Sequence, residues 1–258
     1  MIIDVHGHWG PWFFHTDVAD AAVNLRVMDE CGIDVQLVSA VEAVVYDPLT
    51  GNPALLPVLE AQPRLRGLLV VDPRDLDLAA SQLSSLLPTG LFVGAKIHTH
   101  YAGSPGGSAA MADALTLLAS YDLPVLVHTW GEEIVDLADV VARVDGARVV
   151  AAHLGGPSWP LAPEAARRSD RIWFEPCWST PAPGRIRWVL DRIGPERLMF
   201  GSDATLIHPA VTLGAIRAAE LSPVEEELVM WRNAAELFGL GDAQTLRQPG
   251  IQTPSSTV

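Results

Sequence analysis

The sequence predicts an α/β fold, a (β/α)8 TIM barrel with extra C-terminal helices, from three observations. Short apolar runs alternate with helical patterns, most runs are apolar throughout like parallel strands covered on both faces, and 258 residues suit one barrel domain. An open doubly wound sheet is the alternative, but no glycine-rich phosphate-binding turn follows the first run. We therefore expect one domain over residues 1–245 and a loose polar tail over 246–258.

The expected strands are short and apolar, and they lie at Ile2–His6, Val35–Val41, Gly67–Val71, Leu91–His98, Pro124–His128, Arg148–His153, Ile172–Pro176 and Arg197–Ser202. Helices are expected between and after them, at Val18–Cys31, Asn52–Ala61, Asp75–Leu87, Ser108–Tyr121, Ile134–Val144, Leu161–Arg168, Gly184–Ile193 and Pro209–Leu221. The second of these is the weakest, because Pro53 and Pro57 interrupt it. Ser222 and Pro223 open a further helix that runs to residue 231, and another follows over 233–240.

Charge and composition disfavour several classes of partner. The chain has 17 basic and 31 acidic residues, and its net charge of −14 repels nucleic-acid phosphates and anionic lipids. Two cysteines give no disulfide framework, and the sequence contains neither a basic leader segment nor an apolar run of about 18 residues. We therefore expect a cytoplasmic protein without a membrane span, whose partner is a small-molecule substrate. Assembly into a homodimer is left open.

Histidines stand at the carboxyl ends of four expected strands, namely His6, His98, His128 and His153. His8 lies two residues beyond the end of the first strand, and Asp203 follows the eighth. In a barrel these strand ends share one face, where active sites form. Histidines that only fill a core have no reason to gather at this edge, so the pattern predicts one polar site there.

His6 and His8 form a pair suited to chelation at the end of the first strand. Alternate residues of a strand point the same way, so both imidazoles are expected to reach inward, although the motif alone is a weak signal. His128 adds a third imidazole, and Asp203 adds a carboxylate from across the barrel. This set suits one divalent ion, Zn²⁺ before Mn²⁺ or Fe²⁺, and no organic cofactor is expected.

Further side chains near the strand ends are candidates for contact with a substrate: Lys96, His98, His100, Trp9, Trp130 and Trp178. By strand alternation Lys96 shares the inward side with His98; a lysine that reaches solvent at the strand end is the alternative. The tryptophans fall in loops after strands, where several aromatic rings would line an apolar pocket. No sequence feature activates Cys177, which we expect to line the pocket or to be inert.

Five motifs occur in a fixed order along the chain: Asp-Val-His-Gly-His at 4–8, Gly-Ala-Lys-Ile-His at 94–98, Pro-Val-Leu-Val-His at 124–128, His-Leu-Gly-Gly at 153–156 and Arg-Leu-Met-Phe-Gly-Ser-Asp at 197–203. Together with Asn-Ala-Ala-Glu-Leu-Phe-Gly-Leu at 233–240, they resemble the amidohydrolase-related branch of the amidohydrolase superfamily. That branch includes aminocarboxymuconate-semialdehyde decarboxylase, resorcylate decarboxylases and lactone hydrolases. The resemblance runs from residue 2 to about residue 240.

The resemblance implies a division of roles among these residues. His6, His8, His128 and Asp203 become the ligands of one ion, and His153 becomes a catalytic residue beside it. In two-metal relatives a carboxylated lysine on the fourth strand bridges the ions and the sixth-strand histidine is a ligand. The state of Lys96 therefore decides between one ion and two. Trp130 departs from the family, which usually has glycine there, and would narrow the pocket or stack on a substrate ring.

The sequence thus predicts a metal-dependent hydrolase that acts with water on a lactone, ester or amide carbonyl of a small molecule. Asp203 would take the proton of the water, and His153 would hydrogen-bond the carbonyl oxygen. A non-oxidative decarboxylase of a carboxylated aromatic or muconate-like substrate is the alternative, which the aromatic loops also suit. A non-catalytic ligand-binding barrel is the third hypothesis, disfavoured because the residue types that the metal chemistry needs are all present.

Overall fold

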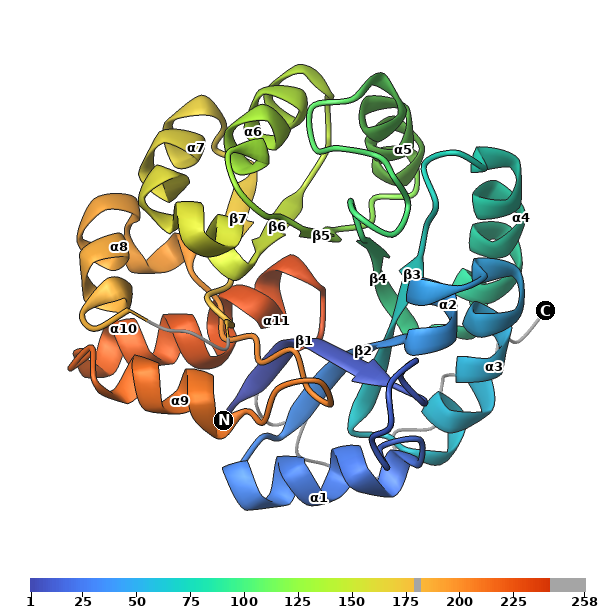
Figure 1. The fold of residues 1–258 in the computed structure, drawn as a ribbon, viewed down its shortest axis with the longest axis horizontal. Coiled ribbons are helices and arrows are strands. Elements are labelled where there is room, and N and C mark those ends of the chain that lie inside the picture. The colour runs from blue at the N-terminus through green and yellow to red at the C-terminus, as the bar shows by residue number, and fades with distance from the viewer. Residues whose placement is uncertain (179–181, 242–258) are drawn as a thin grey trace.

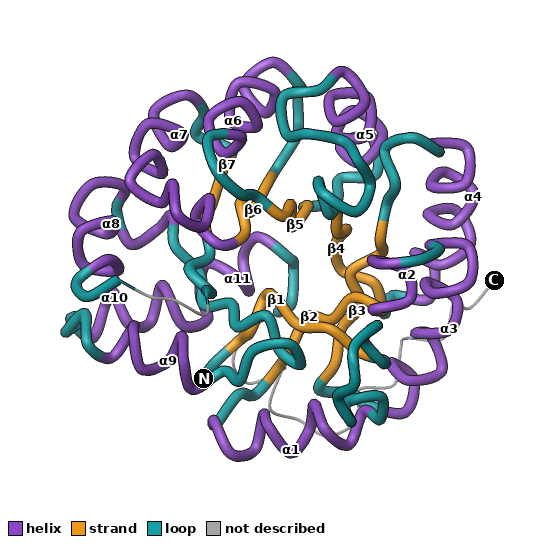
Figure 2. The backbone as a smooth tube through the Cα atoms, viewed as in Figure 1, coloured by secondary structure: helices purple, strands orange, loops and turns teal. Residues whose placement is uncertain are grey.

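Seven parallel strands form one curled sheet, and helices lie around its outer side (Figures 1 and 2). This computed structural model describes residues 1–178 and 182–241. The strands neighbour one another in chain order: β1 (Ile3–Trp9), β2 (Val35–Ala40), β3 (Leu65–Val70), β4 (Phe92–Ile97), β5 (Val125–His128), β6 (Val149–Ala152) and β7 (Ile172–Phe174). Each pair is parallel, because a helical connection returns the chain to the same end of the sheet.

A helix follows every strand of the sheet. The α-helices are α1 (Ala21–Cys31), α2 (Val41–Val45), α3 (Pro48–Ala61), α4 (Leu76–Leu86), α5 (Ala109–Ser120), α6 (Glu133–Arg143), α7 (Ala162–Arg168), α8 (Arg185–Ile193), α9 (Ala210–Arg217), α10 (Pro223–Glu227) and α11 (Asn233–Leu237). Short turns of other helix types are η1 (Leu87–Thr89), η2 (His153–Leu161), η3 (Pro195–Arg197) and the π-helical η4 (Leu228–Arg232). In the described part of the chain, no helix combines the length and apolar character needed to cross a membrane.

Local signals explain where several of these helices begin and end. The carboxylate of Asp20 accepts a hydrogen bond from the backbone N–H of Ala22, and Gly32 ends α1 in the left-handed conformation. α3 is longer than expected despite its internal prolines. The buried side chain of Asn52 bonds both the N–H (2.9 Å) and the C=O (2.8 Å) of Val70 and so fixes the helix to β3. Tertiary contacts here outweigh helix propensity.

The segment 197–204 differs from the expected eighth strand at Arg197–Ser202. It makes isolated parallel bridges, from Leu198 to β7 and from Ala204 to β1. The backbone N–H of Phe200 donates instead to Val229 O in η4 (2.8 Å), and the side chain of Asn233 donates to Leu198 O (2.8 Å). Helix partners thus replace part of the strand ladder, and the sheet has seven strands within the described residues.

The C-terminal region also differs from expectation in its details. The helix expected over 222–231 is divided into α10 and η4, and α11 follows directly. Ser222 and Glu225 form the capping box at the start of α10. The tail expected over residues 246–258 lies outside the described residues.

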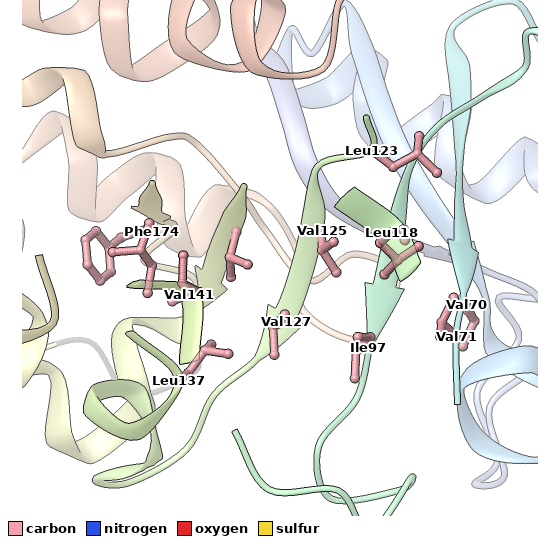
Figure 3. Close-up of a cluster of buried hydrophobic side chains, with 14 of the residues drawn as sticks. Val70, Val71, Ile97, Leu118, Leu123, Val125, Val127, Leu137, Val141 and Phe174 are labelled. Carbon is pink, nitrogen blue, oxygen red and sulfur yellow. The ribbon is translucent and has the colours of Figure 1, made fainter. Parts of the chain in front are cut away.

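Two apolar clusters hold the sheet in place. The larger lies between the strands and the surrounding helices, as Figure 3 shows for Val125, Val127 and Leu137. The smaller lies on the inner side, where Val5, Leu37, Leu68, Leu126 and Val150 meet side chains of α11 and of the residue that follows it, among them Leu237 and Phe238. Alternation along β5 explains the division, because its successive residues point to opposite faces. The apolar clusters leave the carboxyl ends of the strands to polar side chains.

The fully buried carboxylate of Asp4 connects β1, β2 and segment 197–204. It accepts hydrogen bonds from Gln36 Nε2 (2.8 Å), Ser202 Oγ (2.5 Å), Ser202 N (3.0 Å) and His6 N (3.1 Å). Burial raises the pKa of Asp4 to about 7, although the bonds with Ser202 and Gln36 lower it. A single side chain therefore fixes the positions of three segments that carry the site described below.

Replacement of this carboxylate should destabilise the protein. Asp4→Ala leaves several buried donors without an acceptor, and we expect the free energy of unfolding to fall by about 3 kcal/mol. The free energy of unfolding is measured by urea denaturation, with circular dichroism as the signal. The matched control is Asp113→Ala on the exposed side of α5, which should change the same quantity by less than about 0.5 kcal/mol. Equal effects of the two substitutions would contradict the role given to Asp4.

Candidate metal centre

The carboxyl ends of the strands surround a cavity of about 380 Å³. Its lining consists of imidazoles, aromatic rings, two charged groups and two aliphatic side chains: His6, His8, Trp12, Lys96, His98, His100, Tyr101, His128, Trp130, His153, Trp178, Asp203, Leu206 and Ile207. Every site residue expected from the sequence lines this cavity except Trp9. That side chain packs against the larger apolar cluster.

The floor of the cavity brings together His6, His8 and Asp203. His8 Nε2 lies 3.0 Å from Asp203 Oδ1, and His6 Nε2 lies 3.5 Å from the same oxygen. The ligand atoms of these three residues all lie within 4.8 Å of one another, and all three side chains are buried. Two imidazole nitrogens and a carboxylate oxygen are donors that suit zinc and other divalent transition metals.

Gly7 between the two histidines is required for a reason that the sequence did not indicate. A Cβ atom at this position would lie 2.7 Å from the side chain of Gln36. Gln36 is the residue that donates to Asp4 and accepts from Asn24 Nδ2 (2.9 Å), whose amide also donates to His8 O (2.9 Å). Glycine therefore leaves room for the buried hydrogen bonds that hold the first strand.

Asp203 adopts an unusual backbone conformation beside β1. Its φ is 63°, and its N–H donates to His6 O (2.7 Å). Burial alone would raise the pKa of this carboxyl, but the imidazoles of His6 and His8 outweigh it and hold the pKa well below its usual range. Asp203 is therefore ionised, as a metal ligand or a proton acceptor must be.

The opposite ring nitrogens of the two floor histidines have fixed partners. His6 Nδ1 donates to Glu175 Oε1 (2.8 Å), and His8 Nδ1 lies 3.0 Å from Ser39 Oγ. The carboxylate of Glu175 can only accept, so it sets the tautomer of His6 and leaves the Nε2 lone pair of His6 directed at the floor. The hydroxyl of Ser39 can donate or accept, so it orients the ring of His8 without setting its tautomer. Burial lowers the pKa of both histidines, so both are neutral and able to ligate a cation.

Glu175 is a functional residue that the sequence analysis missed. Besides His6, its carboxylate accepts from His153 N (2.9 Å) and from Cys177 N (2.7 Å), and it is fully buried. The available signal was an acidic residue in an apolar run at the end of the seventh strand. Ser39 gave no such signal, because a serine within an apolar strand is common.

His128 stands in the wall of the cavity, outside the group formed by His6, His8 and Asp203. Its ring stacks on His98 at 4.0 Å between centroids, and its centroid lies 5.0 Å from that of His153. Burial lowers the pKa of His98 to about 2 and that of His128 further. Thr99 Oγ1 lies 3.1 Å from His128 Nδ1, which leaves Nε2 as the nitrogen available to a ligand.

The side chain of Lys96 lines the floor of the cavity beside His6. It is fully buried, and Nζ lies 2.8 Å from His6 Nε2. Burial lowers the pKa of its amine, although the charges of Asp203 and Glu175 oppose that change. The side chain of Lys96 therefore points inward, as expected from strand alternation, and does not reach solvent at the strand end.

His153 begins η2 directly after β6 and faces the floor. Its ring centroid lies 5.1 Å from that of His6, and Nδ1 lies 3.1 Å from the carbonyl oxygen of Cys177. The thiol of Cys177 lies behind it, 3.2 Å from the same nitrogen. Burial raises the pKa of this thiol well above its ordinary value, in agreement with an inert cysteine.

Comparison of the sequence with models of protein families identifies the family of this chain. The amidohydrolase family model matches residues 3–240. The chain belongs to the amidohydrolase family. The match spans the whole set of strand-end residues, from His6 to Asp203. Among curated protein sequences, none matches the chain significantly.

Solved structures share this amidohydrolase fold at low sequence identity. The 5-carboxyvanillate decarboxylase of Sphingomonas paucimobilis has a TM-score of 0.72 at 15% identity, over 92% of this chain and 98% of that chain. A Pseudomonas putida protein named a 2-pyrone-4,6-dicarboxylic acid hydrolase has a TM-score of 0.72 at 18% identity, over 92% and 97%. The dihydroxybenzoic acid decarboxylase of Polaromonas sp. JS666, solved with bound manganese and 2-nitroresorcinol, has 0.72 at 16%, over 96% and 99%.

The purified protein should contain about one divalent ion per chain, as measured by elemental analysis. His8→Ala should lose the ion, because it removes an imidazole from the floor. The matched control is His208→Ala, an exposed histidine outside the cavity lining, which should keep the ion. About two ions per chain, together with a carboxylated Lys96 in the mass spectrum, would contradict the expectation.

Glu175→Gln should weaken the affinity for the ion by about 10- to 100-fold, because the charged acceptor of His6 Nδ1–H is lost. Competition with a coloured chelator measures the dissociation constant. Glu164→Gln is the matched control, because Glu164 is a half-buried residue of α7 that pairs with Arg168 and does not line the cavity, and it should leave the affinity unchanged. An unaltered affinity in Glu175→Gln would show that Glu175 has only a structural role.

Proposed function

We propose that this amidohydrolase is a metal-dependent hydrolase in which water attacks the carbonyl of a small lactone, ester or amide. One observation carries the proposal: the ligand atoms of His6, His8 and Asp203 converge within 4.8 Å at the floor of the cavity, with His153 in its wall. A nucleophile, a carbonyl group and a proton acceptor can therefore meet in one space.

The donors fit one divalent ion, which we propose to be Zn²⁺, with His128 as the fourth ligand beside His6, His8 and Asp203. The available Nε2 of His128 and the neutral state of the imidazoles support this assignment. When bound, such an ion polarises a carbonyl and lowers the pKa of water towards neutrality. Mn²⁺ and Fe²⁺ suit the same donors.

The chain supplies the groups that move protons. Asp203 is ionised and can accept the proton of the attacking water, then pass it to the leaving group. The carbonyl oxygen of Cys177 can only accept, so it orients the Nδ1–H of His153. In its charged form His153 can then donate from Nε2 to the carbonyl oxygen of the substrate as negative charge develops there.

Decarboxylation of a carboxylated aromatic is a second candidate, favoured by the aromatic walls of the cavity. His98 and His128 are stacked with an interplanar angle of 16°, and Trp130 lies at 14° to His128. His153 or Asp203 would then handle the proton that the carbon losing CO₂ needs, with Asp203 first taking up a proton before it can deliver one. The solved decarboxylases named above share the fold, as does the hydrolase.

We also propose that segment 197–204 closes the sheet as the eighth strand of a barrel. Its support is the pair of bridges at the two edges of the sheet. Met199 N donates to Phe174 O in β7 (2.9 Å), and Val5 N in β1 donates to Phe200 O (3.1 Å). Asp203 is thereby held opposite His6 and His8.

A substrate panel tests the reaction. Small aromatic lactones, esters and amides should be cleaved by the metal-loaded protein, whereas carboxylated aromatics should release no CO₂. Release of CO₂ without cleavage of any lactone, ester or amide would replace the hydrolase by the decarboxylase. Binding of panel members without any turnover would favour the non-catalytic barrel.

His153→Ala should lower kcat by about 10²- to 10⁴-fold, because it removes the donor to the carbonyl oxygen. The metal content should remain unchanged. Steady-state kinetics and elemental analysis are measured on the same preparation, with His208→Ala as the control. Loss of the ion in His153→Ala would show that His153 is a ligand.

A further inference from the structure

Trp130 occupies a fixed position in the wall of the cavity. Its backbone N–H donates to Glu133 Oε1 (2.7 Å) at the start of α6. Its ring is nearly parallel to His128, at 6.2 Å between centroids, and it stands edge-on to His153 (6.0 Å) and Trp178 (5.9 Å). The side chain remains 38% exposed, so part of the indole is open to a ligand.

Gly156 provides the surface on which the indole rests. A Cβ atom at Gly156 would lie 2.6 Å from Cε3 of Trp130, and the φ of Gly156 is +58°. The backbone of η2 therefore touches the ring directly. A ring held between backbone and neighbouring rings loses little further freedom when a ligand stacks on it, which favours binding.

Among the described residues that line the outer part of the cavity, no lysine or arginine is present to pair with a second anionic group; its polar side chains include His100 and Tyr101. Apart from the histidines, Lys96 and Asp203 are the only residues with a basic or carboxylate side chain among the described residues that line the cavity. Lys96 is fully buried beside His6, so it faces the floor. Arg185 Cζ lies 5.5 Å from the ring centroid of Trp178, but Arg185 is buried and lines a separate cavity beside α8.

We propose that Trp130 determines specificity and that the cavity takes a planar, conjugated ring stacked on its indole. One carbonyl or carboxylate of this ligand is directed at the floor, and the remaining edge of the ring carries no charge. The direction of that group rests on the proposed function, whereas the stacking does not. A dicarboxylate ring would leave one carboxylate without a lysine or arginine partner among the described lining residues, which is unfavourable.

Calorimetric titration of the zinc-loaded full-length protein tests the proposed stacking on Trp130. It measures binding without turnover, so a failed hydrolase assay leaves the result of this test unaffected. Three probes are used: benzoate, cyclohexanecarboxylate and benzene-1,3-dicarboxylate. Benzoate should bind about 5-fold more tightly than its saturated analogue, since aromatic stacking adds to area burial. It should also bind at least about 10-fold more tightly than the dicarboxylate, whose second charge meets no lysine or arginine among the described lining residues.

Variants assign the preference to Trp130. Trp130→Leu should remove the preference for benzoate over cyclohexanecarboxylate, whereas Trp130→Phe should keep most of it. Trp188→Leu is the matched control, because Trp188 is half-buried on α8 against Trp159 and does not line the cavity. Equal binding of the planar and saturated probes, a preference that survives in Trp130→Leu, or tighter binding of the dicarboxylate would each overturn the proposal.

Discussion

The hydrogen bonds of the buried Asp4 carboxylate position the floor of the site. Asp4 bonds the backbone of His6 and of Ser202, the neighbour of Asp203, and through Gln36 and Asn24 it is connected to the carbonyl of His8. The candidate ligands come from opposite ends of the sequence, so their separation is fixed by this network and by the sheet. Loss of one acceptor would therefore disturb both the stability and the geometry of the floor.

The buried surroundings of the site determine which of the candidate ligands are neutral and which is charged. The imidazoles of His6, His8 and His128 are neutral because their surroundings disfavour the charged form. Asp203 stays ionised in the same surroundings because its interactions with His6 and His8 outweigh burial, and these include the contact of 3.0 Å between its Oδ1 and His8 Nε2. A cluster of neutral imidazoles and one anion is poised for a cation, and Glu175 on the outer side of His6 strengthens that imidazole as a donor.

The sequence predicted the features that follow from strand periodicity, and it missed those that depend on tertiary contacts. The parallel α/β order and the gathering of His6, His98, His128 and His153 at one edge follow from short apolar runs that end in histidine. The partners of segment 197–204 in η4 and α11 could not be foreseen, since they join distant segments through backbone and side-chain bonds. Glu175 and Ser39 were missed for the same reason, and Trp9 was placed at the pocket because loop position says little about direction.

The contact between Trp130 and Gly156 also restricts how this protein can change by successive substitutions. Any side chain at residue 156 would collide with the indole, whereas a smaller residue at 130 makes no demand on residue 156. Residue 156 must in addition keep a φ of +58° and a ψ of −119°, which strains every residue except glycine, so exchange of Trp130 removes the collision but not the need for glycine. The pocket can therefore be widened by a single substitution at residue 130, whereas the backbone of η2 keeps its glycine before and after that substitution.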